Sequence, residues 1–114
     1  MYRLYAVWSH PEDIEGFEQY YESIHAPKAA AIPGLQRLVL TRTSDVLGDG
    51  PAPFHRIAEL WFEDRAALDA AIDSPELMLA AEDVVIMEER FGVTLHSPAG
   101  STVDAELGPY MGPK

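Results

Sequence analysis

Apolar residues change their spacing along the chain, and these changes predict the order of strands and helices. Residues 2–9 are rich in aromatic and β-branched side chains, which favours a strand. From residue 11 to residue 25 the apolar positions fall on one helical stripe, with acids between them. The later elements follow as strand, strand, helix, helix and strand, over residues 35–43, 54–62, 64–72, 75–87 and 91–95.

Two prolines bound the first predicted helix. Pro11 suits the first turn, where a missing N–H costs nothing, and the acids behind it favour the positive end of the helix dipole. Pro27 disfavours the helical conformation of the residue before it, so the helix is expected to end or kink at His25. A Pro-Gly pair precedes the next strand, and residues 44–53 predict a long hairpin connection.

The order of elements is typical of a ferredoxin-like α+β fold, βαββαβ, with an extra helical turn before the last strand. That fold has a four-stranded antiparallel sheet with both helices on one face. The strands are apolar on both faces here, and the face without helices would carry Tyr5, Val7, Ile57 and Trp61. Because this is too much apolar surface to leave in water, the sequence predicts a homodimer joined through two open sheet faces.

The length of 114 residues allows one hydrophobic core. We expect residues 1–96 to form this single domain. Residues 97–114 have no clear period and are rich in glycine and proline, so we expect a loop or an arm that rests on the partner.

The charge balance is strongly acidic, with 19 Asp and Glu against 8 Lys and Arg and a net charge of -11. Nucleic acid and anionic membranes are bound by clustered positive charge, so neither is an expected partner. The absence of cysteine excludes disulfides, thiolate nucleophiles and cysteine-ligated metals. No apolar run approaches the roughly 18 residues of a membrane span, and the first residues lack the core of a signal peptide. We therefore expect a cytoplasmic protein.

Two residues are candidates for acid–base chemistry. His25 lies at the predicted end of the first helix, and its neutral imidazole can both take and give a proton near pH 7. Its alternative is a structural role, complementing the helix dipole or binding a last carbonyl. Glu59 lies in an apolar strand, and a carboxylate in apolar surroundings is expected to have a raised pKa unless a cation or a hydrogen bond compensates. Its alternative is an exposed position or an ion pair with Arg37 or Arg56.

A ligand-binding cleft is predicted around these two candidates, for a small and largely apolar organic molecule. Its lining is expected to include Trp8, Tyr21, His55 and Trp61, although a role in the core is the alternative for Tyr21. The four histidines show no H-x-x-x-H or H-x-H spacing, so no metal ligands are predicted. Without a Gly-rich phosphate loop or a G-x-S-x-G motif, no nucleotide cofactor and no serine hydrolysis are expected.

Three segments resemble the EthD family, within the dimeric α+β barrel superfamily. They are YYESIHAPKAAAIPGL at residues 20–35, FHRIAELWFEDRAALDAAIDSPE at residues 54–76 and AAEDVVIMEERF at residues 80–91. The segments cover about half of the chain in the same order as in the family. A tyrosine-rich helix that leads into His-x-Pro and Pro-Gly-Leu, followed by Ala-Glu-Leu-Trp-Phe, carries most of the likeness.

The resemblance implies a homodimeric barrel with a ligand cleft between the sheet and the segment that joins the first helix to the second strand. Asp83 matches an aspartate of the family pattern, for which a structural hydrogen-bond acceptor is expected. EthD proteins take their name from ethyl tert-butyl ether degradation, alongside a cytochrome P450 system. The superfamily includes isomerases, cyclases, decarboxylases and cofactor-free monooxygenases, and the fold alone does not choose among them.

The expected function is acid–base catalysis without metal or nucleotide on an apolar, aromatic or polyketide-like metabolite. In this hypothesis His25 moves a proton and Glu59 orients or polarises the substrate. The alternative is a non-catalytic ligand-binding protein, or an accessory protein to an ether-degrading cytochrome P450 system. A haem-using relative is a third hypothesis, supported only by a histidine near a pocket.

Overall fold

A computed structural model describes residues 1–108. In chain order the elements are β1 (Tyr2–Trp8), α1 (Ile14–Tyr20), the π-helical turn η1 (Tyr21–His25), α2 (Ala26–Ala30), β2 (Arg37–Arg42), β3 (Arg56–Phe62), α3 (Arg65–Ile72), α4 (Pro75–Phe91), β4 (Leu95–His96) and β5 (Ala99–Ser101). The strands form one antiparallel sheet in the order β2-β3-β1-β4, and β5 also pairs with β1. The predicted ferredoxin-like α+β fold is confirmed.

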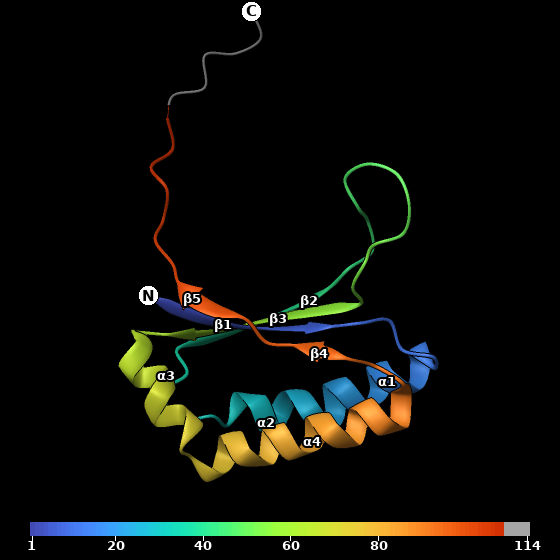
Figure 1. Ribbon diagram of the computed structural model, residues 1–114, viewed down its shortest axis with the longest axis horizontal. Coiled ribbons are helices and arrows are strands. Elements are labelled where there is room, and N and C mark those ends of the chain that lie inside the picture. Colours follow the sequence, from blue (N-terminus) through green and yellow to red (C-terminus); the bar gives the residue numbers. More distant parts are fainter. Residues whose placement is uncertain (109–114) are drawn as a thin grey trace, which may run out of the picture.

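All helices lie on one side of the sheet (Figure 1). Since side chains alternate along a strand, the register of β1 and β3 decides which residues meet them. Leu4 is paired with Leu60, and both contribute to the core under the helices. Tyr5 is paired with Glu59, one residue along each strand, so both point to the open face.

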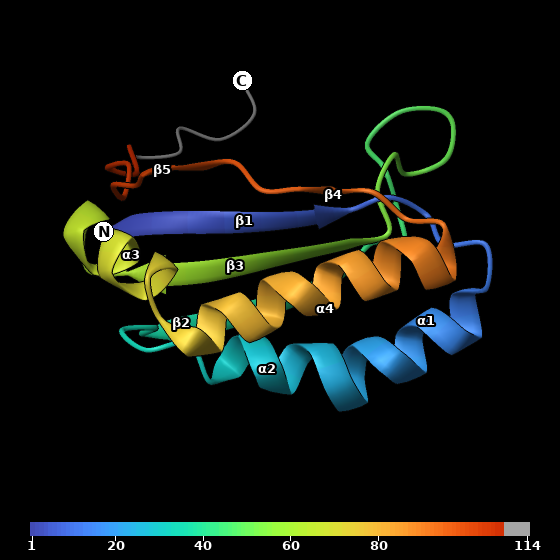
Figure 2. The ribbon, with the colours of Figure 1, turned by 60° about the horizontal axis from the view of Figure 1, so that its bottom comes forward.

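The core consists of two clusters between the helices and the sheet. One is aromatic and joins β1, α1 and the end of α4 through Trp8, Phe17, Tyr21, Met87, Phe91 and Val93. The other is mainly aliphatic and joins β3 to α3 and α4 through Ile32, Ala58, Leu60, Phe62, Leu68, Ala71 and Ala80. In Figure 2, α4 runs alongside the continuous helix formed by α1, η1 and α2.

The end or kink predicted at His25 takes the form of a π turn, through which the helix continues to Ala30. The amide of Ala26 donates to the carbonyl of Tyr21, five residues earlier, where an α-helix would use the residue four earlier. This wide turn starts a new helical segment at Ala26, so Pro27 occupies a first turn, where its missing N–H is harmless. Of the two predicted outcomes, the helix does not end at His25, but its hydrogen-bonding pattern changes there.

The last helix also runs further than predicted and takes Phe91 from the expected strand. Ser74 caps its start, accepting a hydrogen bond from the amide of Leu77 at 3.1 Å. Gly92 ends it in a left-handed conformation, with φ of 66°. The strand that follows the helix is therefore Leu95–His96, not residues 91–95.

The sheet extends past the expected domain end at residue 96. Ala99–Ser101 forms β5 on the edge of β1, and the amide of Thr102 donates to the carbonyl of Met1 at 2.8 Å. Residues 102–108 contain no helix or strand, and residues 109–114 lie outside the described part of the chain. In Figure 1 the β2–β3 connection and the segment after β5 both rise on the open side of the sheet.

No helix within residues 1–108 is long and apolar enough to cross a membrane.

Candidate active site

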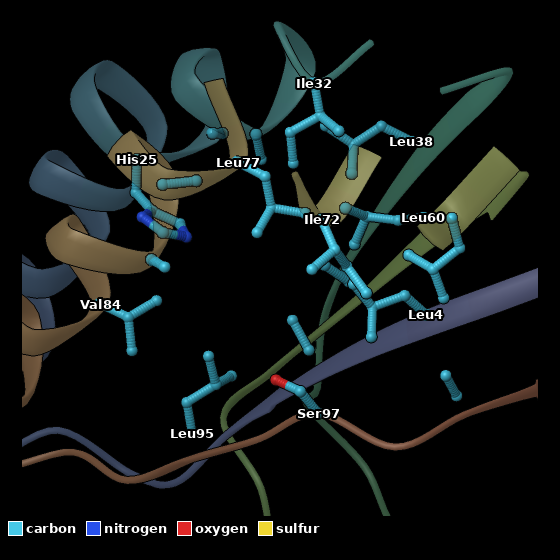
Figure 3. Close-up of a pocket in the computed structure, with 18 of the residues that line it drawn as sticks. Leu4, His25, Ile32, Leu38, Leu60, Ile72, Leu77, Val84, Leu95 and Ser97 are labelled. Carbon is cyan, nitrogen blue, oxygen red and sulfur yellow. The ribbon is translucent and has the colours of Figure 1, made fainter. Parts of the chain in front are cut away.

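A cavity of about 440 Å³ lies between the sheet and the helices, a volume within the usual range for small-molecule sites. Most of its wall is aliphatic, including Leu4, Ala6, Ile32, Leu38, Leu60, Leu68, Ile72, Leu77 and Val84. Polar groups in the wall are few: the imidazole of His25 on η1, the indole N–H of Trp8, the hydroxyls of Tyr2, Tyr21 and Ser97, and Arg65 with Asp69 on α3. Figure 3 shows His25 at one side of this space, facing the aliphatic residues of the sheet and α4.

Aromatic rings hold the imidazole of His25 in the cavity wall. The Trp8 ring lies 5.2 Å from it, edge to face at 85°, and the Tyr21 ring lies 5.9 Å away. His25 is only 7% exposed and Trp8 is wholly buried. The structure thus brings together three predicted site residues, His25, Tyr21 and Trp8, around one cavity.

Asp83 on α4 holds the other side of the imidazole. His25 Nδ1 lies 2.8 Å from Asp83 Oδ2, and the Tyr20 hydroxyl donates to Asp83 Oδ1 at 2.5 Å. Lys28 Nζ lies 3.6 Å from the same Oδ1. Because an ionised carboxylate can only accept, Nδ1 must carry the proton of a neutral imidazole, which leaves a lone pair on Nε2.

Burial and hydrogen bonding set the protonation states of this cluster. Burial lowers the pKa of His25 below its usual 6.5, and this outweighs the opposite effect of the bond to Asp83. For Asp83, burial acts to raise the pKa, but the hydrogen bonds from Tyr20 and His25 lower it below 3.8. Burial raises the pKa of Tyr21 to about 12. At neutral pH the site therefore holds a neutral imidazole beside an ionised carboxylate.

We expect His25 to titrate below pH 6.5 in the folded protein, because its pKa is lowered by burial. An unfolded chain would then bind the proton at a higher pH than the native one, so this group destabilises the fold as pH falls from 6.5. NMR titration of the His25 ring protons in wild type, assigned by their loss in His25→Asn, measures the midpoint. A midpoint at or above 6.5 would contradict the buried, neutral imidazole.

His55 lies outside the cavity, in a second buried cluster. Its Nε2 lies 2.9 Å from Glu18 Oε2, and its ring contacts Phe17 at 5.3 Å between centroids. Arg56 binds both oxygens of Glu18, with Nε at 3.0 Å and Nη2 at 2.6 Å, and stacks over the Tyr21 ring. These hydrogen bonds join α1 to the start of β3. His55 was predicted to line the ligand cleft, but the structure places it in this second cluster instead.

Glu59 and Trp61 lie on the open face of the sheet, so the structure does not place them in one site with His25. Glu59 accepts a hydrogen bond from Arg3 Nη1 at 3.1 Å, and the guanidinium of Arg3 lies 3.6 Å above the Trp61 ring. Side chains alternate along β3, so Glu59 and Trp61 share the face that the sequence itself assigned to the helix-free side, opposite to the face that His25 meets. The grouping of Glu59 and Trp61 with His25 is thus corrected.

Asp83 was not among the predicted site residues, although a signal for it exists in the sequence. It lies on the buried stripe of α4, together with Ala80, Met87 and Phe91. A single carboxylate on an apolar stripe needs a partner, because burying an unpaired charge is costly. No group of three or more metal-ligating side chains was found within residues 1–108.

The model of the EthD domain matches residues 9–87, more than half of the chain. The chain belongs to the EthD family. Among curated proteins, this EthD chain is 36% identical over 84 residues to an uncharacterized 11.0 kDa protein of Rhodococcus erythropolis from the thcB-thcC intergenic region. That match covers 74% of this chain and 81% of the Rhodococcus protein.

Solved structures show the same fold. An ethyl tert-butyl ether degradation (EthD) family protein of Bacillus halodurans aligns with a TM-score of 0.73 and 28% identity, over 90% of this EthD chain and 99% of that protein. SnoaB of Streptomyces nogalater, a cofactor-independent oxygenase, aligns with a TM-score of 0.64 and 16% identity. The alignment covers 91% of this chain and 94% of SnoaB. At that identity the likeness to SnoaB concerns the fold alone.

Proposed function

We propose that this EthD protein is an acid–base enzyme in which His25 takes a proton from a small, largely apolar organic molecule bound in the cavity. The observation that carries the proposal is the buried His25–Asp83 pair, 2.8 Å apart, at the wall of an aliphatic cavity. In this proposal His25 Nε2 is the base. Asp83 is a positioning residue that holds the imidazole in the tautomer with a free Nε2.

The surroundings of the pair suit this role. A neutral imidazole can accept a proton at pH 7 without first losing one. The charge that then develops on the imidazolium lies beside an ionised, buried carboxylate, where electrostatic stabilisation is stronger than in water. Tyr20 and Lys28 hold Asp83 from the other side, so the carboxylate does not need to reorient during the transfer.

Among the structural relatives, SnoaB is described as a cofactor-independent oxygenase, so this fold supports oxygenase activity without a cofactor. One fold hosts many reactions. The proposal for this chain is therefore limited to proton transfer, the step that His25 and Asp83 can perform. Whether it serves an isomerase, a cyclase, a decarboxylase or an oxygenase depends on the substrate.

A neutral, flat probe tests the base without the natural substrate. In 5-nitrobenzisoxazole a base removes the proton on C3, the electron pair of that bond forms a nitrile, and the N–O bond breaks to give a coloured phenolate. We expect the protein to accelerate this ring opening, and the acceleration to require His25. Binding of the probe, followed by NMR, without any acceleration would favour the alternative of a non-catalytic ligand-binding protein.

We also propose that two copies pair through their open sheet faces. This face carries Tyr5, Val7, Val39, Ile57 and Trp61, all partly exposed. The guanidinium groups of Arg3 and Arg37 lie over the Trp61 ring at 3.6 and 4.8 Å, so cation–π contacts hold these side chains on the face. A second sheet would remove this apolar surface from water.

Light scattering at micromolar concentration is expected to give the mass of a dimer. Ile57→Glu should give a monomer, because it places a charge in the centre of the proposed interface. Ile24→Glu is the matched control, since Ile24 is 40% exposed on the helical side and should leave the dimer intact. A monomeric wild type, or equal masses for the two variants, would contradict the proposal.

A further inference from the structure

The hydrogen-bonding state of His25 limits the kind of ligand that can meet it. Nδ1 is already used, because it donates to Asp83 Oδ2 at 2.8 Å. The neutral ring then offers only an acceptor, Nε2, to the cavity. A ligand group that complements this nitrogen must donate a hydrogen, as an O–H group or an acidic C–H group does.

The cationic side chains around the cavity form ion pairs with carboxylates. Lys28 lies 3.6 Å from Asp83, and Arg56 binds Glu18 at 2.6 Å. In the cavity wall itself, among residues 1–108, Arg65 is the one cationic side chain apart from any charge on His25. It is 75% exposed and faces Asp69 at 3.9 Å.

The other donors in the wall are neutral: the indole N–H of Trp8, which has no hydrogen-bond partner within residues 1–108, and the hydroxyls of Tyr2, Tyr21 and Ser97. A carboxylate in the cavity would therefore lack a buried cation to compensate its charge. It would lose its water in an aliphatic environment, and a buried charge without a partner is strongly unfavourable. It would also approach Asp83, whose side chain is wholly unexposed and ionised. The net charge of -11 adds a long-range repulsion of anions. A neutral acid avoids all three effects.

We propose that the cavity selects neutral oxygen or carbon acids, such as phenols and enolisable ketones, and excludes carboxylates of the same size. The inference rests on the proposed function, because it assigns a ligand class to the same site. The ligand donates to His25 Nε2, and its apolar body fills the space between β1, β3 and α4. Recognition thus depends on the acceptor at His25 and on the negative charge of Asp83.

Three naphthalenes of similar size separate these effects by isothermal titration calorimetry at pH 7. 2-Naphthol is neutral there and can donate, 2-naphthoate is ionised, and 2-methoxynaphthalene is neutral but cannot donate. We expect 2-naphthol to bind at least about tenfold more tightly than 2-naphthoate, the ratio that corresponds to one uncompensated polar group. 2-Methoxynaphthalene should bind less tightly than 2-naphthol, because it leaves Nε2 without a donor.

The Asp83→Asn variant provides an internal check. Removing the buried charge should raise the affinity for 2-naphthoate and so reduce the difference in affinity between 2-naphthol and 2-naphthoate. Circular dichroism checks that the variant is folded. Equal or tighter binding of 2-naphthoate to wild type would overturn the inference and leave the base proposal standing. The same holds if 2-methoxynaphthalene binds as tightly as 2-naphthol. If none of the three binds, the cavity is not a ligand site and both proposals fail.

Discussion

His25→Ala is expected to lower the protein-catalysed rate of 5-nitrobenzisoxazole opening by about 10²–10⁴-fold, the range in which a positioned general base contributes. The variant removes the only imidazole in the wall of the cavity within residues 1–108. His25→Asn tests the same point with less loss of packing, because its amide can still donate to Asp83. The absorbance of the phenolate product gives the rates, and circular dichroism checks the fold.

Two further variants distinguish the role of His25 as the base from the effects of another histidine and of its partner Asp83. His10→Ala is the matched control, because His10 is exposed and its Nε2 binds the carbonyl of Ala52 at 2.6 Å, away from the cavity. It should retain the wild-type rate. Asp83→Asn should keep some activity but lower the His25 titration midpoint, since the hydrogen bond and charge of Asp83 act to raise that pKa. If His25→Ala and His25→Asn both open the probe at the wild-type rate, His25 is not the base.

Glu18→Gln is expected to lower the free energy of unfolding by about 3 kcal/mol, the lower end of the cost of breaking a buried ion pair. Glu18 is the shared acceptor of His55 and Arg56, whose side chains are 5% and 8% exposed. Its loss leaves the two donors with a neutral amide in place of a carboxylate. Urea unfolding at one fixed protein concentration measures the difference, since a dimer would make stability depend on concentration.

Glu22→Gln is the control for this effect. Glu22 also binds Arg56, at 3.2 Å, but its side chain is 69% exposed, so its substitution should lower the free energy of unfolding by less than about 1 kcal/mol.

The stabilisation by Glu18 should also depend on pH. Burial alone would raise the pKa of Glu18, but the hydrogen bonds from Arg56 and His55 lower it below 4.5. Its stabilisation is thus complete above pH 4.5 and is lost as pH falls further. The difference in the free energy of unfolding between wild type and Glu18→Gln should therefore decrease below pH 4.5. A difference that stays constant would show that the charge of Glu18 does not cause the stabilisation.

Much of the fold follows from the local pattern of apolar residues. The alternation in the strands and the helical spacing between them give the order of the elements, and that order is compatible with few topologies. The ends of the helices are harder to predict from the sequence. Gly92 decides where α4 stops, yet the β-favouring residues around it suggested a strand from Phe91 onward.

The candidate site was partly predictable. His25 was predicted as a site residue because it belongs to the His-x-Pro motif after the first helical stripe. Tyr21 was predicted because it lies on the apolar stripe of the same helix. Asp83 was expected only as a structural hydrogen-bond acceptor, because its partner His25 lies 58 residues away in the chain and the local sequence does not show which side chain it meets. Glu59 was selected for its apolar neighbours, but its own partner, Arg3, is supplied by the adjacent strand.

The π turn at Tyr21–His25 has a consequence for comparing sequences of this family. Phe17, Tyr21, His25 and Ala29 repeat every four residues, more than one α-helical turn of 3.6, and the wide turn takes up the excess. Deleting one residue inside this turn would restore a regular helix and leave the residues after it on their present faces, because a π turn accommodates one extra residue in about the same rotation. A relative whose alignment shows a gap here is therefore expected to present the same side chains to its cavity after the turn, with its His-x-Pro motif in the same place.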